Sequence, residues 1–189
     1  MTNTALLVVD AQESFRQRPY WTDADFPRFC DRLQSLITGC ADRNVPVVQI
    51  FHVEDEGAFS LASGHVRTLA PIAIKPDFSF HKRMHSALAG TPLAGWLTER
   101  GIQRVIVTGI RTEQCCETTT RHASDSGWKV DYVTEATLTF PMVHPRTGRR
   151  FSSEEIHQAL FGNKPGQPRS LDELKDGVRR YVRKRYARS

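Results

Sequence analysis

Residues 107–115 read Val107-Thr108-Gly109-Ile110-Arg111-Thr112-Glu113-Gln114-Cys115. The apolar run before Gly109 is typical of a buried strand, and the glycine predicts a turn. Cys115 then falls in the first turn of an expected helix over about 113–126, which Gly127 ends. The unpaired N–H groups and positive dipole of a helix N-terminus lower the pKa of a thiol and stabilise an oxyanion. This placement predicts an enzyme with a cysteine nucleophile.

The two adjacent cysteines are expected to have different roles. A buried and inert thiol is the commonest state of a cysteine, and we expect it for Cys116, which should pack against the sheet. At Cys115 the position favours a nucleophile, because Thr112 can cap the helix and backbone amides near residues 111 and 115 can converge on one oxygen.

The rest of the chain predicts a three-layer α/β/α fold with a parallel, Rossmann-like sheet of five to six strands. Short apolar runs rich in β-branched residues are the expected strands, at 5–9, 45–51, 105–108 and 130–133, with 72–74 as a weaker candidate. Between these strands, two segments have apolar residues at helical spacing. One runs from Phe26 to Cys40, with Asp25 as its N-cap, and the other from Thr91-Pro92 to Gly101.

Ligands of such sheets lie beyond the carboxyl ends of the strands. Asp10 and the Gly109 turn both follow strands and meet there if those strands are neighbours. Asp10 is either a strand-end cap or a desolvated carboxylate of raised pKa that takes the proton of Cys115, with Gln12 orienting it.

Composition narrows the class of protein. The chain has 189 residues, of which 39% are hydrophobic and 25% charged, as in one ordinary globular domain. Four cysteines do not form a disulfide framework at this length, so we expect a cytoplasmic location. We find no signal peptide and no apolar run long enough to span a membrane.

The positive charge belongs to the end of the chain. Residues 164–189 carry nine Lys or Arg and three acids, a net charge of +6, which leaves −1 for the remainder. We expect a linker at 162–169 and a basic amphipathic helix at 170–189, packed on the body or on a partner subunit. Its basic face is predicted to be solvated, with binding to nucleic acid or an anionic surface as the alternative.

Three segments carry a resemblance to a known family. They are Asp10-Ala11-Gln12-Glu13-Ser14-Phe15, residues 82–91 and residues 109–123. In order they match Asp-x-Gln-x-x-Phe, Lys-x-x-x-Ser-Ala-Phe-x-Gly-Thr (with Leu88 for Phe) and Gly-x-x-Thr-x-x-Cys-Val-x-x-Thr-Ala-Arg-Asp-Ala. Over about 4–140 the chain therefore resembles the isochorismatase-like cysteine hydrolases, which include nicotinamidases and N-carbamoyl-amide hydrolases.

The resemblance assigns roles to particular residues. It implies a hydrolase domain over 1–161 and a catalytic triad of Asp10, Lys82 and Cys115, and it selects Lys82 over Lys75. It also implies a cis peptide bond at Ile110–Arg111 and an oxyanion hole from the backbone amides of Arg111 and Cys115. The substrate pocket is expected to include Gln12, Phe15, Ile110 and Arg111, and family members are often homo-oligomers such as dimers or tetramers.

Two departures from the family pattern leave alternatives open. Arg111 stands where relatives commonly carry a small residue, so it either forms a structural salt bridge or selects a substrate carboxylate. Nicotinamidases hold a metal through an Asp-x-His element, which is absent from the stretch His52-Val53-Glu54-Asp55-Glu56-Gly57, with His65 following later. We therefore expect no metal and no cofactor.

The resulting functional prediction is a cysteine amidohydrolase. It would cleave a C–N bond of a small amide or carbamoyl compound through a thioester on Cys115, with water as the second reactant. One alternative is an isochorismatase-type vinyl ether hydrolase, which needs no thiol. Another, from a different class, is a non-catalytic protein that binds a polyanion with its basic C-terminal helix.

Overall fold

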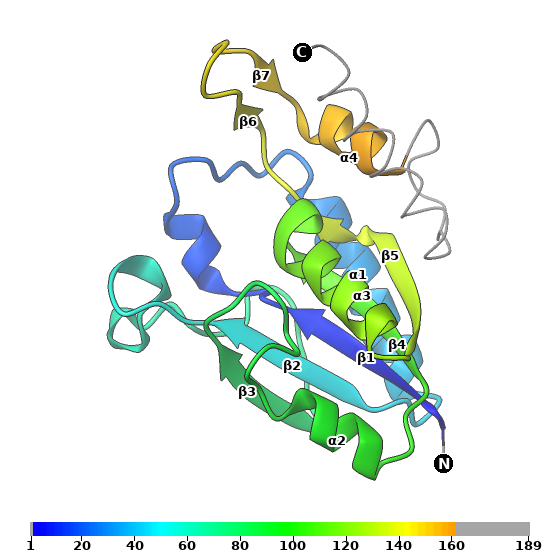
Figure 1. Cartoon of the computed structure of the whole chain (residues 1–189). Helices are drawn as coiled ribbons and strands as arrows, with labels where there is room; N and C mark the ends of the chain where they lie inside the picture. The colour runs from blue at the N-terminus through cyan, green and yellow to red at the C-terminus, as the bar shows by residue number, and fades with distance from the viewer. Residues whose placement is uncertain (1, 162–189) are drawn as a thin grey trace.

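A five-stranded parallel sheet forms the centre of the protein, in a computed structural model that describes residues 2–161 (Figure 1). Its strand order is β3-β2-β1-β4-β5. The strands are β1 (Thr4–Val9), β2 (Val47–His52), β3 (Phe78–Lys82), β4 (Arg104–Ile110) and β5 (Lys129–Leu138). This order places β1 between β2 and β4, so the direction of winding reverses beside β1.

Helices cover both faces of the sheet, which confirms the predicted three-layer fold. On one face α1 (Phe26–Ala41) packs on alternate residues of β1 such as Leu6 and Val8. On the other face α2 (Leu93–Glu99) and α3 (Glu117–Asp125) pack on the intervening residues, Leu7 among them. Figure 1 shows α1 behind the sheet and α2 and α3 in front of it. Because successive side chains of a strand point to opposite faces, one apolar strand serves both layers.

The prediction of a strand at 72–74 is wrong. That segment is a loop flanked by Pro71 and Pro76. Proline has no backbone N–H and cannot donate a hydrogen bond to a neighbouring strand. The fifth strand is β3, which lies at the edge of the sheet and packs mainly on one face. From Phe78 to His81 its side chains therefore alternate between partly buried and exposed. The expected strands at 105–108 and 130–133 are longer than predicted, as β4 and β5 show.

Helix starts follow the sequence pattern in part. Asp25 precedes α1 as expected, but its side chain makes no capping hydrogen bond. A capping box opens α4 (Ser153–Phe161), since Ser152 Oγ accepts from Glu155 N at 3.2 Å and Ser152 N donates to Glu155 Oε2 at 2.9 Å. Before α4 the chain forms a small antiparallel pair, β6 (Met142–Val143) and β7 (Arg150–Phe151).

Short turns complete the described part of the chain. Three of them are 3₁₀ turns, at Glu13–Gln17, Gly57–Phe59 and Leu61–Ser63, and one is a π-helical turn at Thr112–Cys116. None of the helices within residues 2–161 combines the length and apolar character needed to cross a bilayer. The predicted linker at 162–169 and basic helix at 170–189 lie outside the described residues.

Candidate active site

The carboxyl ends of β1 and β4 bring Asp10 and the 109–115 turn together, as the sequence predicted for neighbouring strands. The two strands pair in parallel with Val9 opposite Gly109. A Cβ at Gly109 would lie 1.8 Å from the carbonyl oxygen of Val9, and its φ of +121° also requires glycine. Asp10 itself has a φ of 50°, an unusual left-handed conformation that turns the chain out of β1.

Lys82 reaches this point from the end of the edge strand β3. Its Nζ lies 2.7 Å from Asp10 Oδ2, and both side chains are fully excluded from solvent. The ammonium also donates to the carbonyl oxygen of Met84 at 3.1 Å. A buried lysine needs such partners, because an unpaired charge in the interior is strongly destabilising.

Cys115 completes the cluster from the turn after β4. Lys82 Nζ lies 3.4 Å from Cys115 Sγ. Asp10 Oδ1 is buried and has no hydrogen-bond partner of ordinary geometry among the described residues, so it remains available to accept a proton. The thiol lies in the π-helical turn that precedes α3, not in the first turn of a regular α-helix. The structure thus assembles Asp10, Lys82 and Cys115 from three strand ends.

Burial and the mutual charges set the ionisation of these groups. Burial raises the pKa of Asp10 by more than the nearby charge and hydrogen bond of Lys82 lower it. Burial also acts to lower the pKa of Lys82, but the charges and hydrogen bonds of Asp10 and Cys115 raise it above its usual value. Lys82 is therefore an ammonium, and it supplies the positive charge beside Asp10.

The expectation of a lowered thiol pKa is wrong for this resting site. Burial raises the pKa of Cys115, and the charge of Asp10 raises it further, against the opposing effect of Lys82. The thiol is therefore protonated at rest and needs a base, and Asp10 is the carboxylate next to it.

The residues that hold this turn differ from those predicted. Thr112 was expected to cap the helix, but its hydroxyl donates to Thr137 Oγ1 at 3.0 Å. The turn closes instead on Arg111, whose carbonyl oxygen accepts from the amides of Gln114 and Cys116 at 3.2 and 3.3 Å. The Ile110–Arg111 peptide bond is cis.

Two histidines at the site were not assigned to it from the sequence, where His52 was considered only as a metal ligand. His52 Nδ1 lies 3.3 Å from Lys82 Nζ, and His85 Nδ1 lies 3.6 Å from Cys115 Sγ. Burial and the charge of Lys82 lower the pKa of His52 to about 4, so its ring is neutral at pH 7. A signal was present, because His52 ends one strand and His85 follows the end of the next by three residues.

The predicted pocket residues lie mostly in the packed interior. Gln12 is fully buried, donates to the carbonyl oxygen of His52 at 3.0 Å and accepts from its amide at 2.8 Å. It therefore fixes the end of β2 beside Asp10. Ile110 is fully buried, and Phe15 is 5% exposed and packs on Phe59. Contact of these three residues with substrate remains a prediction.

Arg111 forms an ion pair, the first of the two arrangements considered for it. Its Nη2 lies 2.9 Å from Glu113 Oε1, and the two side chains are only 11% and 10% exposed. The guanidinium also lies over the rings of Tyr20 and Phe140, at 5.0 and 5.8 Å from their centroids. Its charge is thus neutralised within the protein.

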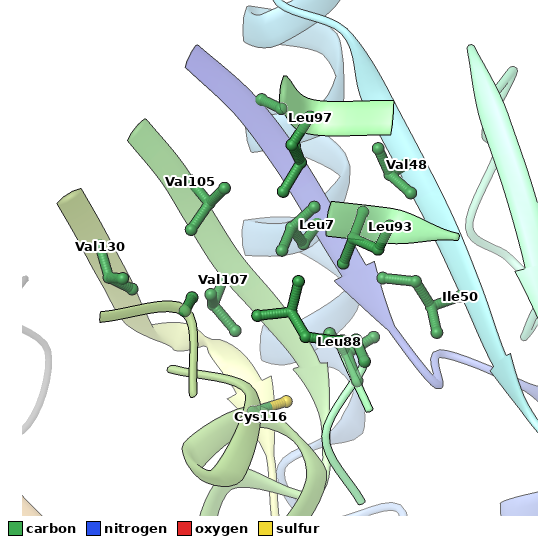
Figure 2. Close-up of a cluster of buried hydrophobic side chains, with 14 of the residues drawn as sticks. Leu7, Val48, Ile50, Leu88, Leu93, Leu97, Val105, Val107, Cys116 and Val130 are labelled. Atoms are coloured by element: carbon green, nitrogen blue, oxygen red, sulfur yellow. The ribbon is translucent and has the colours of Figure 1, made fainter. Parts of the chain in front are cut away.

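Cys116 packs in the core, as predicted. It is fully buried, and its sulfur points into the apolar cluster, toward the side on which Leu88 lies (Figure 2). Burial raises its pKa well above the usual value. Cys116 therefore serves as an internal control for Cys115.

Possible metal ligands among the described residues do not gather into a cluster. Within residues 2–161 no group of three or more His, Cys, Asp or Glu side chains is arranged to hold an ion. His52 contacts Lys82 and, through Nε2, Glu54 at 3.7 Å, whereas the backbone carbonyl oxygen of His65 accepts from Ser14 at 3.0 Å.

Comparisons with known proteins agree with this architecture. The isochorismatase domain model matches residues 4–159. Nicotinamidase 3 of Arabidopsis thaliana is 38% identical over 88 residues, which cover 47% of this chain and only 38% of that protein. The isochorismatase family protein YrdC of Bacillus subtilis is 24% identical over 141 residues, covering 73% of this chain and 75% of that one.

Solved structures show the same fold. A candidate isochorismatase from Burkholderia xenovorans superposes with a TM-score of 0.76 at 26% identity and covers 98% of this chain and 97% of its own. A cysteine hydrolase from Pseudomonas syringae gives 0.75 at 20% identity, with 96% and 94% covered. At that identity the second match establishes the fold alone.

Proposed function

The chain belongs to the isochorismatase family of hydrolases, and on that premise we propose that it cleaves a C–N bond of a small amide or carbamoyl compound through a thioester on Cys115. The observation that carries the proposal is the contact of Cys115 Sγ with a solvent-excluded Asp10–Lys82 pair. A lone buried cysteine needs no such pair, whereas a nucleophile with a raised pKa needs a base and a counter-charge.

The first half of the reaction forms the thioester. Asp10 Oδ1 takes the proton of Cys115, and the ammonium of Lys82 stabilises the thiolate as it forms. The sulfur attacks the carbonyl carbon, and the backbone amides of Arg111 and Cys115 stabilise the tetrahedral oxyanion. The C–N bond then breaks, and ammonia or an amine leaves with one added proton. Water hydrolyses the thioester in the second half and restores the thiol.

A vinyl ether hydrolase on this scaffold would place different demands on the site. That reaction proceeds by proton transfer to the substrate and forms no bond to sulfur. A thiol held at 3.4 Å from the lysine has no part in it. The Cys115→Ser variant separates the two reactions, since an ether hydrolase would keep its turnover and an amidohydrolase would lose most of it.

The direct test is a matched pair of cysteine variants. Each protein is offered a panel of primary amides and carbamoyl compounds, and intact mass spectrometry records acyl adducts. We expect the parent and Cys116→Ala to form an adduct and turn over, and Cys115→Ala to do neither. Retained turnover in Cys115→Ala, or its loss in a folded Cys116→Ala, contradicts the proposal.

A further inference from the structure

His85 is the exposed titratable side chain that touches the reacting sulfur. It follows β3 in the turn after Lys82, and its Nδ1 lies 3.6 Å from Cys115 Sγ. Asp10 and Lys82, the other two charged groups at the thiol, have side chains with no exposed surface. The site therefore has a buried side, which holds the thiol proton, and an outer side, which carries an imidazole.

A leaving group can reach solvent on the outer side, because the side chains of Asp10 and Lys82 have no exposed surface. The nitrogen that leaves is bonded to the same carbon as Sγ, so a ring nitrogen within 3.6 Å of the sulfur is also within reach of it. Asp10 receives the thiol proton on the buried side and is held there by Lys82. Protonation of the leaving nitrogen by a group already facing solvent requires no movement of that buried pair.

The second histidine cannot take this role. Lys82 is an ammonium that can only donate, so His52 Nδ1 must accept at their 3.3 Å contact. His52 is also neutral at pH 7 because its pKa is lowered to about 4. It positions Lys82, whereas the ring of His85 faces Cys115.

We propose that His85 is a second catalytic residue, which protonates the leaving nitrogen and later takes a proton from the attacking water. This inference rests on the proposed amide hydrolysis. In acylation the Cys115 proton passes to Asp10, the S–C bond forms, the C–N bond breaks, and the His85 imidazolium gives its proton to the nitrogen. In deacylation neutral His85 takes a proton from water as its oxygen bonds to carbon. The S–C bond breaks, and protonated Asp10 returns its proton to the thiolate.

The charged groups around His85 are compatible with this cycle. Lys82 lies 2.7 Å from Asp10, so its positive charge is directed at that carboxyl group and away from His85. The neighbouring ring of His52 is neutral at pH 7 and adds no further charge. Since the side chain of His85 is exposed, bulk water reaches it between turnovers.

The test uses 4-nitrophenyl acetate, whose leaving group departs without an added proton. In His85→Gln the burst of nitrophenolate from acylation should stay within about threefold of the parent, while the steady-state rate from deacylation falls about 10- to 100-fold. The acetyl adduct on Cys115 should then accumulate by intact mass. His81→Gln, which replaces another exposed histidine four residues away, should match the parent in both phases.

Two results overturn the role of His85. One is a steady-state rate in His85→Gln within about twofold of the parent, because the water would then need no imidazole. The other is a loss in the rate of the burst as large as the loss in the steady-state rate, because His85 would then act on the thiol itself. A burst that persists in Cys115→Ala contradicts the proposed function instead, so the two failures can be told apart.

Discussion

Lys82 Nζ lies 2.7 Å from Asp10 Oδ2 in a pair from which solvent is fully excluded. The two residues come from strands that are not neighbours, since β2 lies between β1 and β3. The pair therefore ties the edge of the sheet to its centre beside Cys115. It has a structural role as well as a chemical one, and the two roles can be separated by substitution.

Replacing Lys82 by Met should remove turnover and also lower the free energy of unfolding by about 3–5 kcal/mol, because Asp10 becomes an unpaired buried charge. Adding Asp10→Asn to this variant removes that charge and should restore part of the stability but none of the activity. Arg83→Met breaks an exposed pair with Asp55 and should change stability by less than about 0.5 kcal/mol. Chemical denaturation measures all three. Equal stability of Lys82→Met and the parent contradicts the prediction.

His52 should make the fold sensitive to acid. Its folded pKa of about 4 lies below the 6.5 of an unperturbed histidine, so between these values the unfolded chain binds more protons. The free energy of unfolding should thus fall as the pH falls from 6.5 to 4, and the stabilisation is fully present above 6.5. His157 has a pKa lowered by burial and contributes with the same sign, so the comparison must be between variants.

His52→Gln isolates the contribution of His52. Glutamine keeps an acceptor for Lys82 but does not titrate. Between pH 7 and pH 4.5 the parent should lose on the order of 2 kcal/mol more stability than the variant, measured by urea unfolding. Parallel losses in the two proteins would show that His52 does not titrate in this range.

The fold followed from features that one strand or helix shows by itself. Apolar runs such as 5–9 and the Gly109 turn identified the centre of the sheet, because buried strands and a glycine at a positive φ leave local patterns. The edge strand β3 was missed because only one of its faces is packed. The triad needed the ordered family motifs, since composition and periodicity do not distinguish Lys82 from Lys75.

The thiol pKa and the contacts of His85 could not be predicted in the same way. Both depend on how deeply the 109–115 turn is buried and on side chains from β1 and β3 that fold against it. A helix-terminus pattern describes local dipoles alone and carries no information on desolvation by distant segments. Long-range burial of this kind has no local sequence signature.

Gly109 should tolerate no side chain. A Cβ there would meet the Val9 carbonyl oxygen at 1.8 Å, so Gly109→Ala should lower the free energy of unfolding by about 3 kcal/mol or more and displace Asp10. Gly90→Ala is the matched control, because its φ of +67° is also left-handed but nothing lies within 4 Å of the new Cβ. That control should cost about 1 kcal/mol. Similar losses in both variants would mean that the contact with Val9 is unimportant.

Arg111 should contribute to stability and not to substrate choice, because its charge is paired with Glu113 at 2.9 Å. Arg111→Met should lower the free energy of unfolding by about 3 kcal/mol, and Glu113→Gln in the same protein should recover part of the loss. Selectivity is measured as the ratio of kcat/KM for succinamate and butyramide, which differ by a carboxylate in place of a methyl group. If Arg111 is held by Glu113, this ratio should stay within about threefold of the parent in Arg111→Met. If Arg111 selected a substrate carboxylate, the variant would lose succinamate turnover at least tenfold. A selective loss of that size in a stable variant would show that Arg111 leaves Glu113 to bind the substrate.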